Sequence, residues 1–204
     1  MKSMRDFAVL SSIVLGASAV SSASAAIITF TQQNVWEGYS VSAGSTIFTE
    51  TFNGIADGFY ASPYSGTTGP VNWTADAVGG IFVQAGLFST NNPTTLTFDF
   101  GAGVDGVAGN FFATDINFNV VPAFVSLTLN DGTSYDIGYI DSQTAYTGFY
   151  STGALITGLQ IQATQPGGNV YPTVDNMQFA TIPAPGAIAL AGLAAAVGGR
   201  RRRR

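Results

Sequence analysis

Residues 124–139 read FVSLTLNDGTSYDIGY, and this stretch decides the fold that we expect. Apolar residues alternate with Ser and Thr up to Leu129, which is typical of a strand with one buried face. The sequence Asn-Asp-Gly at 130–132 follows, and such residues form tight turns because they accept positive φ. Alternation resumes over 135–139. The stretch therefore predicts an antiparallel β-hairpin.

The same alternation recurs along the chain, with Leu96, Phe98 and Phe100 on one face of another expected strand. Further strand-like runs cover 47–52, 81–88, 107–113, 155–163 and 173–179. Many short strands separated by Gly, Asn, Asp and Pro are typical of a two-sheet fold. We expect residues 26–181 to form an all-β domain, an antiparallel β-sandwich of jelly-roll type. No segment of this domain shows helical spacing.

Every basic side chain lies at an end of the chain. Residues 26–182 hold 11 acidic residues and no Lys, Arg or His, because only Asp6 of the 12 acidic residues lies outside that range. Such a body repels nucleic acid and offers no cation to a nucleotide, so we expect no nucleic-acid partner. The chain also has no Cys, which with the lack of His excludes thiol nucleophiles, the usual serine triads and thiolate or imidazole zinc sites.

The N-terminus has the three parts of a secretory signal peptide. Lys2 and Arg5 are charged, residues 7–20 are apolar, and Ala23 and Ala25 occupy the small-residue positions before a cleavage site. We expect residues 1–25 to be removed, with a cut after Ala26 as the alternative. The sequence therefore predicts an exported protein.

The C-terminal segment, 182–204, contains a short motif, an uncharged stretch and a cationic end. The motif is Pro183, Ala184, Pro185 and Gly186, and the cationic end is Arg200, Arg201, Arg202, Arg203 and Arg204. Arginines that follow an apolar stretch resist translocation and stay cytoplasmic, so the segment predicts a stop in the inner membrane. Residues 183–199 are short for a membrane span and rich in Ala and Gly, which favours temporary residence.

This order of elements resembles the PEP-CTERM sorting signal of Gram-negative bacteria, although Ala184 stands where the family has Glu. The resemblance implies processing by an exosortase, an integral membrane enzyme often found in bacteria that make exopolysaccharide. It also implies delivery to the cell surface or the extracellular matrix after transient residence in the inner membrane. A simple C-terminal membrane anchor and an artificial extension remain as alternatives.

Two acidic residues are candidate metal ligands. Glu50 lies in an early expected strand and Asp175 in the last one. The pair resembles the acids of non-catalytic carbohydrate-binding jelly rolls, and the resemblance implies a structural calcium held together with backbone carbonyls. Calcium needs only oxygen ligands, so the composition permits it. The alternative is that both acids face solvent at strand edges.

The longest irregular stretch expected, 57–73, concentrates three aromatic residues, Tyr60, Tyr64 and Trp73. Exposed ring faces beside hydroxyls suit stacking on extracellular polysaccharide. The alternative is that the rings pack onto the sandwich and order the loop. The aspartates at 99, 105, 115, 131, 136 and 141 lie near Gly or Asn, where turn chemistry accounts for them.

These observations favour a non-enzymatic cell-surface or matrix β-sandwich protein with an adhesive, structural or glycan-associated role. A secreted carbohydrate-active enzyme would use a carboxylate pair. However, the body offers no cation or imidazole to tune such a pair. A permanently anchored periplasmic protein is the third hypothesis.

Overall fold

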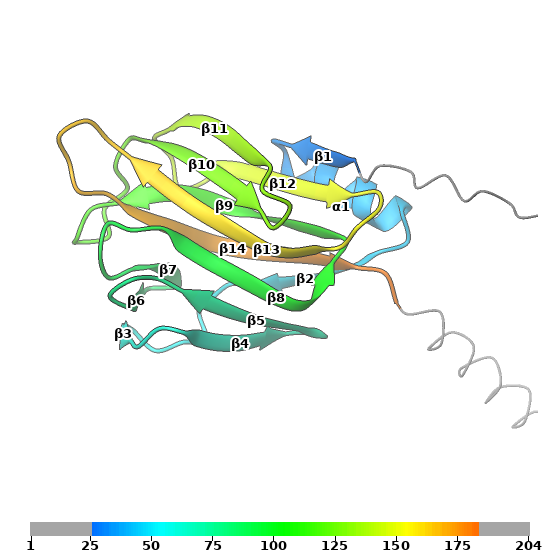
Figure 1. Ribbon diagram of the computed structural model, residues 1–204, viewed down its shortest axis with the longest axis horizontal. Coiled ribbons are helices and arrows are strands. Elements are labelled where there is room, and N and C mark those ends of the chain that lie inside the picture. Colours follow the sequence, from blue (N-terminus) through cyan, green and yellow to red (C-terminus); the bar gives the residue numbers. More distant parts are fainter. Residues whose placement is uncertain (1–25, 184–204) are drawn as a thin grey trace, which may run out of the picture.

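The computed structural model describes residues 26–183, which form two antiparallel β-sheets packed face to face (Figure 1). The expected signal peptide and nearly all of the sorting segment lie outside the described residues. No described helix is long and apolar enough to cross a membrane. The predicted β-sandwich is confirmed for the part of the chain that the structure describes.

Both sheets are built from short strands. In spatial order, the larger sheet contains β1 (Ile27–Phe30), β12 (Tyr146–Ser151), β9 (Gly106–Thr114), β14 (Tyr171–Thr181), β7 (Leu87–Thr90), β6 (Ile81–Gln84) and β3 (Gly58–Tyr60), and β2 (Thr46–Glu50) also pairs with β14. The smaller sheet contains β11 (Ser134–Ile140), β10 (Ala123–Leu129), β13 (Ile156–Thr164), β8 (Leu96–Val104), β5 (Val71–Asp76) and β4 (Tyr64–Thr68).

The eight consecutive strands β7 to β14 follow the jelly-roll order. The first strand of this series pairs with the last, β7 with β14, and the next pairs inward are β8 with β13, β9 with β12 and β10 with β11. A long hairpin wrapped into a two-sheet barrel gives this nested pairing. The expected hairpin at 124–139 is its innermost pair, β10 and β11.

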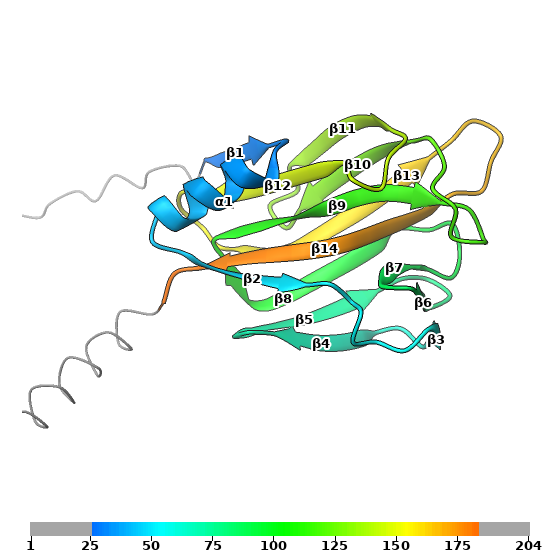
Figure 2. The same cartoon turned by 180° about the vertical axis from the view of Figure 1, so that it is seen from behind.

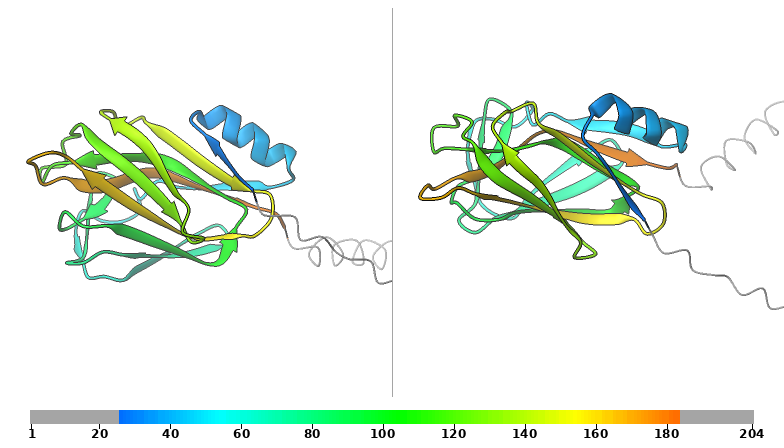
Figure 3. Two further views of the ribbon diagram at one scale, coloured as in Figure 1. Left: turned by 45° about the horizontal axis from the view of Figure 1, so that its top comes forward. Right: turned by 90° about the horizontal axis from the view of Figure 1, so that it is seen from above.

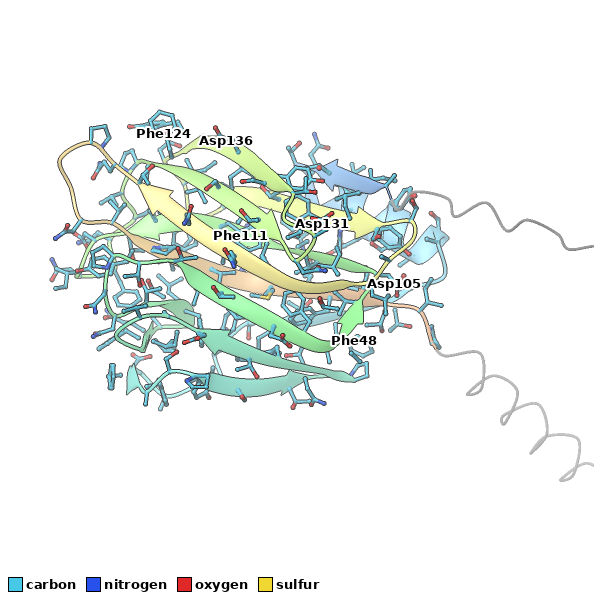
Figure 4. The ribbon with its side chains drawn as sticks, in the orientation of Figure 1. Phe48, Asp105, Phe111, Phe124, Asp131 and Asp136 are labelled. Atoms are coloured by element: carbon cyan, nitrogen blue, oxygen red, sulfur yellow. The ribbon has the colours of Figure 1, made fainter. Side chains whose placement is uncertain are left out.

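The core lies between the sheets and is rich in phenylalanine. Leu96, Phe98 and Phe100 are at most 1% exposed, as their alternation predicts. Phe111 of β9, labelled in Figure 4, is fully buried and belongs to the core cluster between the sheets. Outward positions on the smaller sheet are mainly Thr, Ser and Gln, so most of its strands have one apolar and one polar face.

The helix α1 (Gln33–Ser42) corrects the expectation that the body has no helix. It lies on the outer face of the larger sheet (Figure 3), where Trp36 is fully buried and donates a hydrogen bond from Nε1 to the Phe149 carbonyl at 3.1 Å. Gly148 makes room for this ring, since a Cβ there would lie 2.5 Å from Trp36 Cδ1. Only Trp36 and Ser40 of the helix are buried, and no side chain caps its start, so the sequence carries little helical signal.

The stretch 57–73 is also not the irregular loop that we expected. It contains β3, β4 and the start of β5, and β4 and β5 form a hairpin that turns at residues 69 and 70. Gly69 takes a φ of +60° at this turn. The strand β4 consists of Tyr, Ser, Gly and Thr only, so it lacks the apolar alternation by which strands are identified.

Both ends of the described chain leave the sandwich on the same side (Figure 2). Ala26 exchanges backbone and hydroxyl hydrogen bonds with Thr152 at 3.0 to 3.3 Å. The carboxylate of Asp105, which lies at this end (Figure 4), accepts a hydrogen bond from the Ile182 N–H at 2.6 Å. These contacts fix the points where the expected signal peptide and sorting segment join the domain.

Candidate functional site

A cavity of about 240 Å³ lies on the outer face of the larger sheet, at the far end of β14 from Ile182. The register places Ser89 opposite Thr173, while their neighbours Phe88 and Val174 point into the core. The cavity therefore opens on the same face that α1 covers at the other end of the sheet. Its lining residues come from β6, β7, β9, β14 and the 115–119 turn: Phe82, Gln84, Ser89, Thr90, Asn91, Thr114, Asp115, Ile116, Phe118 and Tyr171.

Three hydroxyl groups on adjacent strands form the floor beside the cavity. Ser89 Oγ donates to the Pro172 carbonyl at 3.1 Å and accepts from Thr173 Oγ1 at 2.9 Å. Thr114 Oγ1 lies 3.0 Å from Thr173 Oγ1. Thr173 Oγ1 also lies 3.0 Å from the Tyr171 carbonyl, so its single proton has more than one acceptor. The three hydroxyls therefore form one connected network within the protein.

The turn at 115–119 holds one wall of the cavity in a strained conformation. Phe118 has a φ of +62°, which is uncommon for a bulky residue. Its ring nevertheless lies 5.6 Å, between centroids, from that of Phe82 on β6. Strained backbone persists only where the surroundings enforce it and is concentrated at functional sites. The two half-buried rings therefore mark this end of the sheet as a candidate binding site.

Asp115 enforces that conformation. Its Oδ1 accepts the backbone N–H groups of Asn117 and Asn119 at 2.8 and 2.9 Å, and its Oδ2 accepts Asn119 Nδ2 at 3.0 Å. The N–H of Phe118 also donates to the Asp115 carbonyl at 3.1 Å. The Asn119 side chain, followed by these backbone N–H groups, lowers the pKa of Asp115, so the carboxylate stays ionised. Asp115 therefore acts on the cavity by positioning the ring of Phe118.

Thr90 is the one lining residue whose polar group is buried without a partner among the described residues. It is 3% exposed, and its Oγ1 makes no hydrogen bond. A buried polar group left without a partner is uncommon and calls for a water, an ion or a ligand group. The register pairs Thr90 with the core residue Ile81, so this hydroxyl lies on the inner face of β7, opposite the face that carries Ser89 and the cavity.

The structure places Trp73 in the core rather than in a ligand platform. It is 2% exposed, its ring lies 5.9 Å from Phe88, and its Nε1 donates to Thr68 Oγ1 at 3.0 Å. Tyr64 and Tyr60 are half-buried and pack against each other at 4.9 Å. Of the two interpretations of this stretch, packing onto the sandwich describes Trp73, because the indole fills the space between the sheets.

Glu50 and Asp175 lie on opposite faces of the larger sheet and cannot share one calcium ion. Glu50 pairs with the core residue Met177, whereas Asp175 pairs with Asn110 on the outer face. Glu50 instead accepts hydrogen bonds from the Phe52 N–H at 2.8 Å and from Thr68 Oγ1 at 2.5 Å. No group of three or more acidic side chains within 26–183 could hold a metal ion.

A β-bulge in β14 lies between Asp175 and the region of Met177, the residue that pairs with Glu50. The register shifts between Asp175 and Gln178, and Asn176 takes a φ of +51° at the shift. Burial raises the pKa of Asp175. The bulge thus turns Asp175 outward, away from Glu50, and sequence alternation alone could not reveal this.

Three of the six aspartates that we assigned to turns make local backbone hydrogen bonds. Asp99, Asp131 and Asp136 each accept the backbone N–H two residues onward, at 2.8 to 2.9 Å. Asp131 lies in the turn between β10 and β11, whereas Asp99 and Asp136 lie within β8 and β11, beside Gly101 and Gly138 with positive φ. These carboxylates are therefore explained by local structure.

A wider groove of about 560 Å³ follows the edge where β11 faces β1 and β12. Its two tyrosine rings are engaged within the protein: Tyr135 packs on Phe149 at 4.7 Å, and the Tyr146 hydroxyl donates to Gln178 Oε1 at 2.9 Å. The cavity beside the strained turn, with its two half-buried rings, is therefore the stronger candidate site.

No protein-family model matches the sequence, and no curated protein matches it. The fold belongs to the class of jelly-roll β-sandwiches, and solved structures with similarity to it include carbohydrate-binding modules of family 29. A mutant of one such module is 10% identical over 67% of this chain and 92% of its own, with a TM-score of 0.38. Another structure of the family is 9% identical over 67% and 89%, also with a TM-score of 0.38.

Proposed function

We propose that this chain is an exported, non-enzymatic β-sandwich protein that binds polysaccharide through the cavity between β6, β7 and the 115–119 turn. The observation that carries the proposal is the pair of rings, Phe82 and Phe118, held 5.6 Å apart by a strained turn beside buried hydroxyls. A sugar ring presents apolar C–H faces and hydroxyl edges, so it matches a surface that combines aromatic rings with hydrogen-bonding groups.

The lining chemistry supports binding rather than catalysis. A glycosidase places two carboxylates on either side of the bond that it cleaves. Among the residues that line the cavity, Asp115 is the one carboxylate. Its oxygens already accept three hydrogen bonds from the turn, and its pKa is lowered, which suits a positioning residue and not a proton donor.

The position of the chain ends supports presentation of the cavity away from a membrane. Ala26 and Ile182 leave the sandwich at one end, and the cavity lies at the other end of β14. In our proposal the signal peptide, 1–25, directs export, and the segment 182–204 holds the protein in the inner membrane until an exosortase-type enzyme processes it. The cavity then faces outward, toward polysaccharide at the cell surface or in the matrix.

Two measurements test these two parts separately. Affinity electrophoresis against a panel of polysaccharides tests binding, with Phe118→Ala as the loss-of-function variant. Phe124→Ala removes a phenylalanine that is 49% exposed on the other sheet and serves as the matched control. Intact-mass analysis of surface material tests processing: we expect a form without Arg200 to Arg204, and recovery of the whole tail supports a permanent anchor instead.

A further inference from the structure

We infer that the cavity holds the end of a linear glycan chain, and that the next residue of this chain stacks on Phe59 of the edge strand β3. This inference rests on the proposed function and specifies which part of the polysaccharide is bound. Three features support it: the turn that closes one side of the cavity, the register of β6 with β3, and the position of the Phe59 ring.

The 115–119 turn closes the side of the cavity that faces β9. It starts directly after β9, and its Phe118 ring reaches Phe82 on β6, although β14 and β7 lie between β9 and β6. Ser89 and Thr173 lie on the outer face of β7 and β14 and are nevertheless 0% exposed. The turn therefore covers these two strands at the cavity, and a bound polymer cannot continue across them.

The outer face of the sheet is open on the opposite side, toward β3. Phe82 pairs directly with Phe59, while the neighbours of Phe82 on β6, Ile81 and Val83, belong to the core. Both phenylalanines therefore lie on the outer face, on adjacent strands that are about 4.8 Å apart. Within the described residues, no strand pairs with the other edge of β3. A chain that starts in the cavity thus passes from Phe82 over Phe59 into solvent.

The ring of Phe59 is exposed, but its position is fixed. It is 56% exposed and lies over Gly80, where an added Cβ would lie 2.5 Å from Phe59 Cε2. Next to β3, Asp57 Oδ1 accepts the Ala85 N–H at 2.8 Å, which ties this edge to the turn between β6 and β7. A ring that is held in place loses little conformational freedom on binding, so Phe59 suits stacking on the C–H face of a sugar.

The size of the cavity limits the enclosed part of the polymer to about one sugar residue. Its volume of about 240 Å³ is below the roughly 300 Å³ at which small-molecule sites begin. An internal residue of a chain needs an exit on both sides, whereas a terminal residue needs only one. The enclosed residue is therefore the terminal one, and the second residue lies outside the cavity, over Phe59.

The first test counts the binding sites on a linear polysaccharide that the wild-type protein binds. Partial hydrolysis of this polymer multiplies the chain ends while the total mass of glycan stays constant. We expect the number of binding sites per unit mass, measured by isothermal titration calorimetry, to rise in proportion to the number of chain ends. A constant number of sites per unit mass overturns the inference and leaves the proposed function standing.

Phe59→Ala tests the second contact, with the monosaccharide and the disaccharide of the same polymer as probes. We expect the variant to bind the disaccharide roughly threefold to tenfold more weakly than the wild type does, which is the size of one aromatic contact. Both proteins should bind the monosaccharide equally. Phe59→Tyr keeps the ring and should keep the affinity. Val78→Ala, at a side chain that is 75% exposed before β6, is the matched control and should change neither affinity.

Thermal unfolding shows whether Phe59→Ala acts through the site or through the fold, and we expect little change in melting temperature because the ring is exposed. Unchanged affinity of Phe59→Ala for the disaccharide overturns the inference. An equal loss for the monosaccharide and the disaccharide also overturns it, because the ring then supports the cavity and not a second residue. If no saccharide binds the wild type, the proposed function fails, and the inference fails with it.

Discussion

The ring of Phe118 lies 5.6 Å from the ring of Phe82 although the two residues belong to segments 36 positions apart and Phe118 has a φ of +62°. One residue comes from a regular strand and the other from a five-residue turn at the end of β9. Their meeting depends on the carboxylate of Asp115, which organises the turn from within. The aromatic wall of the cavity is therefore as stable as that carboxylate network.

Asp115→Ala should loosen the turn and weaken polysaccharide binding roughly tenfold, because the ring of Phe118 is no longer preorganised. The melting temperature should change little, since the turn is at the surface. Titration with a bound polymer and thermal unfolding measure the two effects. A large stability loss with unchanged affinity would show that the turn supports the fold and not the site.

The same carboxylate sets the pH range of binding. Hydrogen bonds lower the pKa of Asp115 below its ordinary value of 3.8, so its stabilisation of the turn is present above that value and is lost as pH falls through the lowered pKa. We expect constant affinity between about pH 7 and pH 4 and a decline only below. A decline already near neutral pH contradicts the role of Asp115.

Trp73→Ala should lower the free energy of unfolding by roughly 3 to 5 kcal/mol, because it leaves a cavity between the sheets. Trp73→Phe keeps part of the ring and should cost less. Denaturant unfolding measures both. Weakened glycan binding with unchanged stability would restore the platform hypothesis that the buried indole now contradicts.

Calcium and magnesium should raise the melting temperature equally at matched ionic strength, because Glu50 and Asp175 lie on opposite faces of the sheet.

Asp175→Asn should raise the free energy of unfolding at neutral pH, since burial raises the pKa of Asp175 and disfavours its charged form. This gain should vanish below pH 3.8, where the carboxyl group is protonated in both states. Glu50→Gln should lower stability, because Glu50 accepts two hydrogen bonds. A rise in melting temperature that is specific to calcium and is lost in either variant would contradict the placement of Glu50 and Asp175 on opposite faces of the sheet.

Gly148→Ala should displace Trp36 and cost roughly 1 to 3 kcal/mol, because the new Cβ would lie 2.5 Å from the indole. Gly38→Ala is the matched control: it lies in the same helix–sheet unit with nothing within 4 Å of its Cβ, and it should stabilise the helix slightly. Thermal unfolding with far-ultraviolet circular dichroism distinguishes them. Equal changes in stability for Gly148→Ala and Gly38→Ala would contradict the close packing of Trp36 against Gly148.

The sequence predicts the strands of the sandwich well where one face of a strand is buried and the other is exposed to solvent. The alternation at Leu96, Phe98 and Phe100 and the Asn-Asp-Gly turn at 130–132 predict strands that the structure contains. The helix is hidden because it buries only Trp36 and Ser40. The contact of Trp36 with Gly148 joins positions 112 residues apart, so no local pattern signals it.

The cavity could not be predicted from the sequence either, because its lining residues are far apart along the chain. Its residues come from five segments between positions 82 and 171, which only the jelly-roll pairing brings together. The left-handed backbone of Phe118 has no local sequence signature, since Asn or Gly normally occupies such a position. Conversely, Tyr60, Tyr64 and Trp73 are close together in the sequence, which suggests a binding site, but in the structure they pack in or against the core.

Chemical-shift mapping with a bound oligosaccharide tests the central claim most directly. We expect amide and aromatic shifts at Phe82, Phe118 and Tyr171, which line the cavity, and none at Phe124 or Tyr139, whose rings are exposed on the opposite sheet. Shifts confined to Phe124 and Tyr139, or spread along the groove at Tyr135, would contradict the assignment of the cavity as the glycan site.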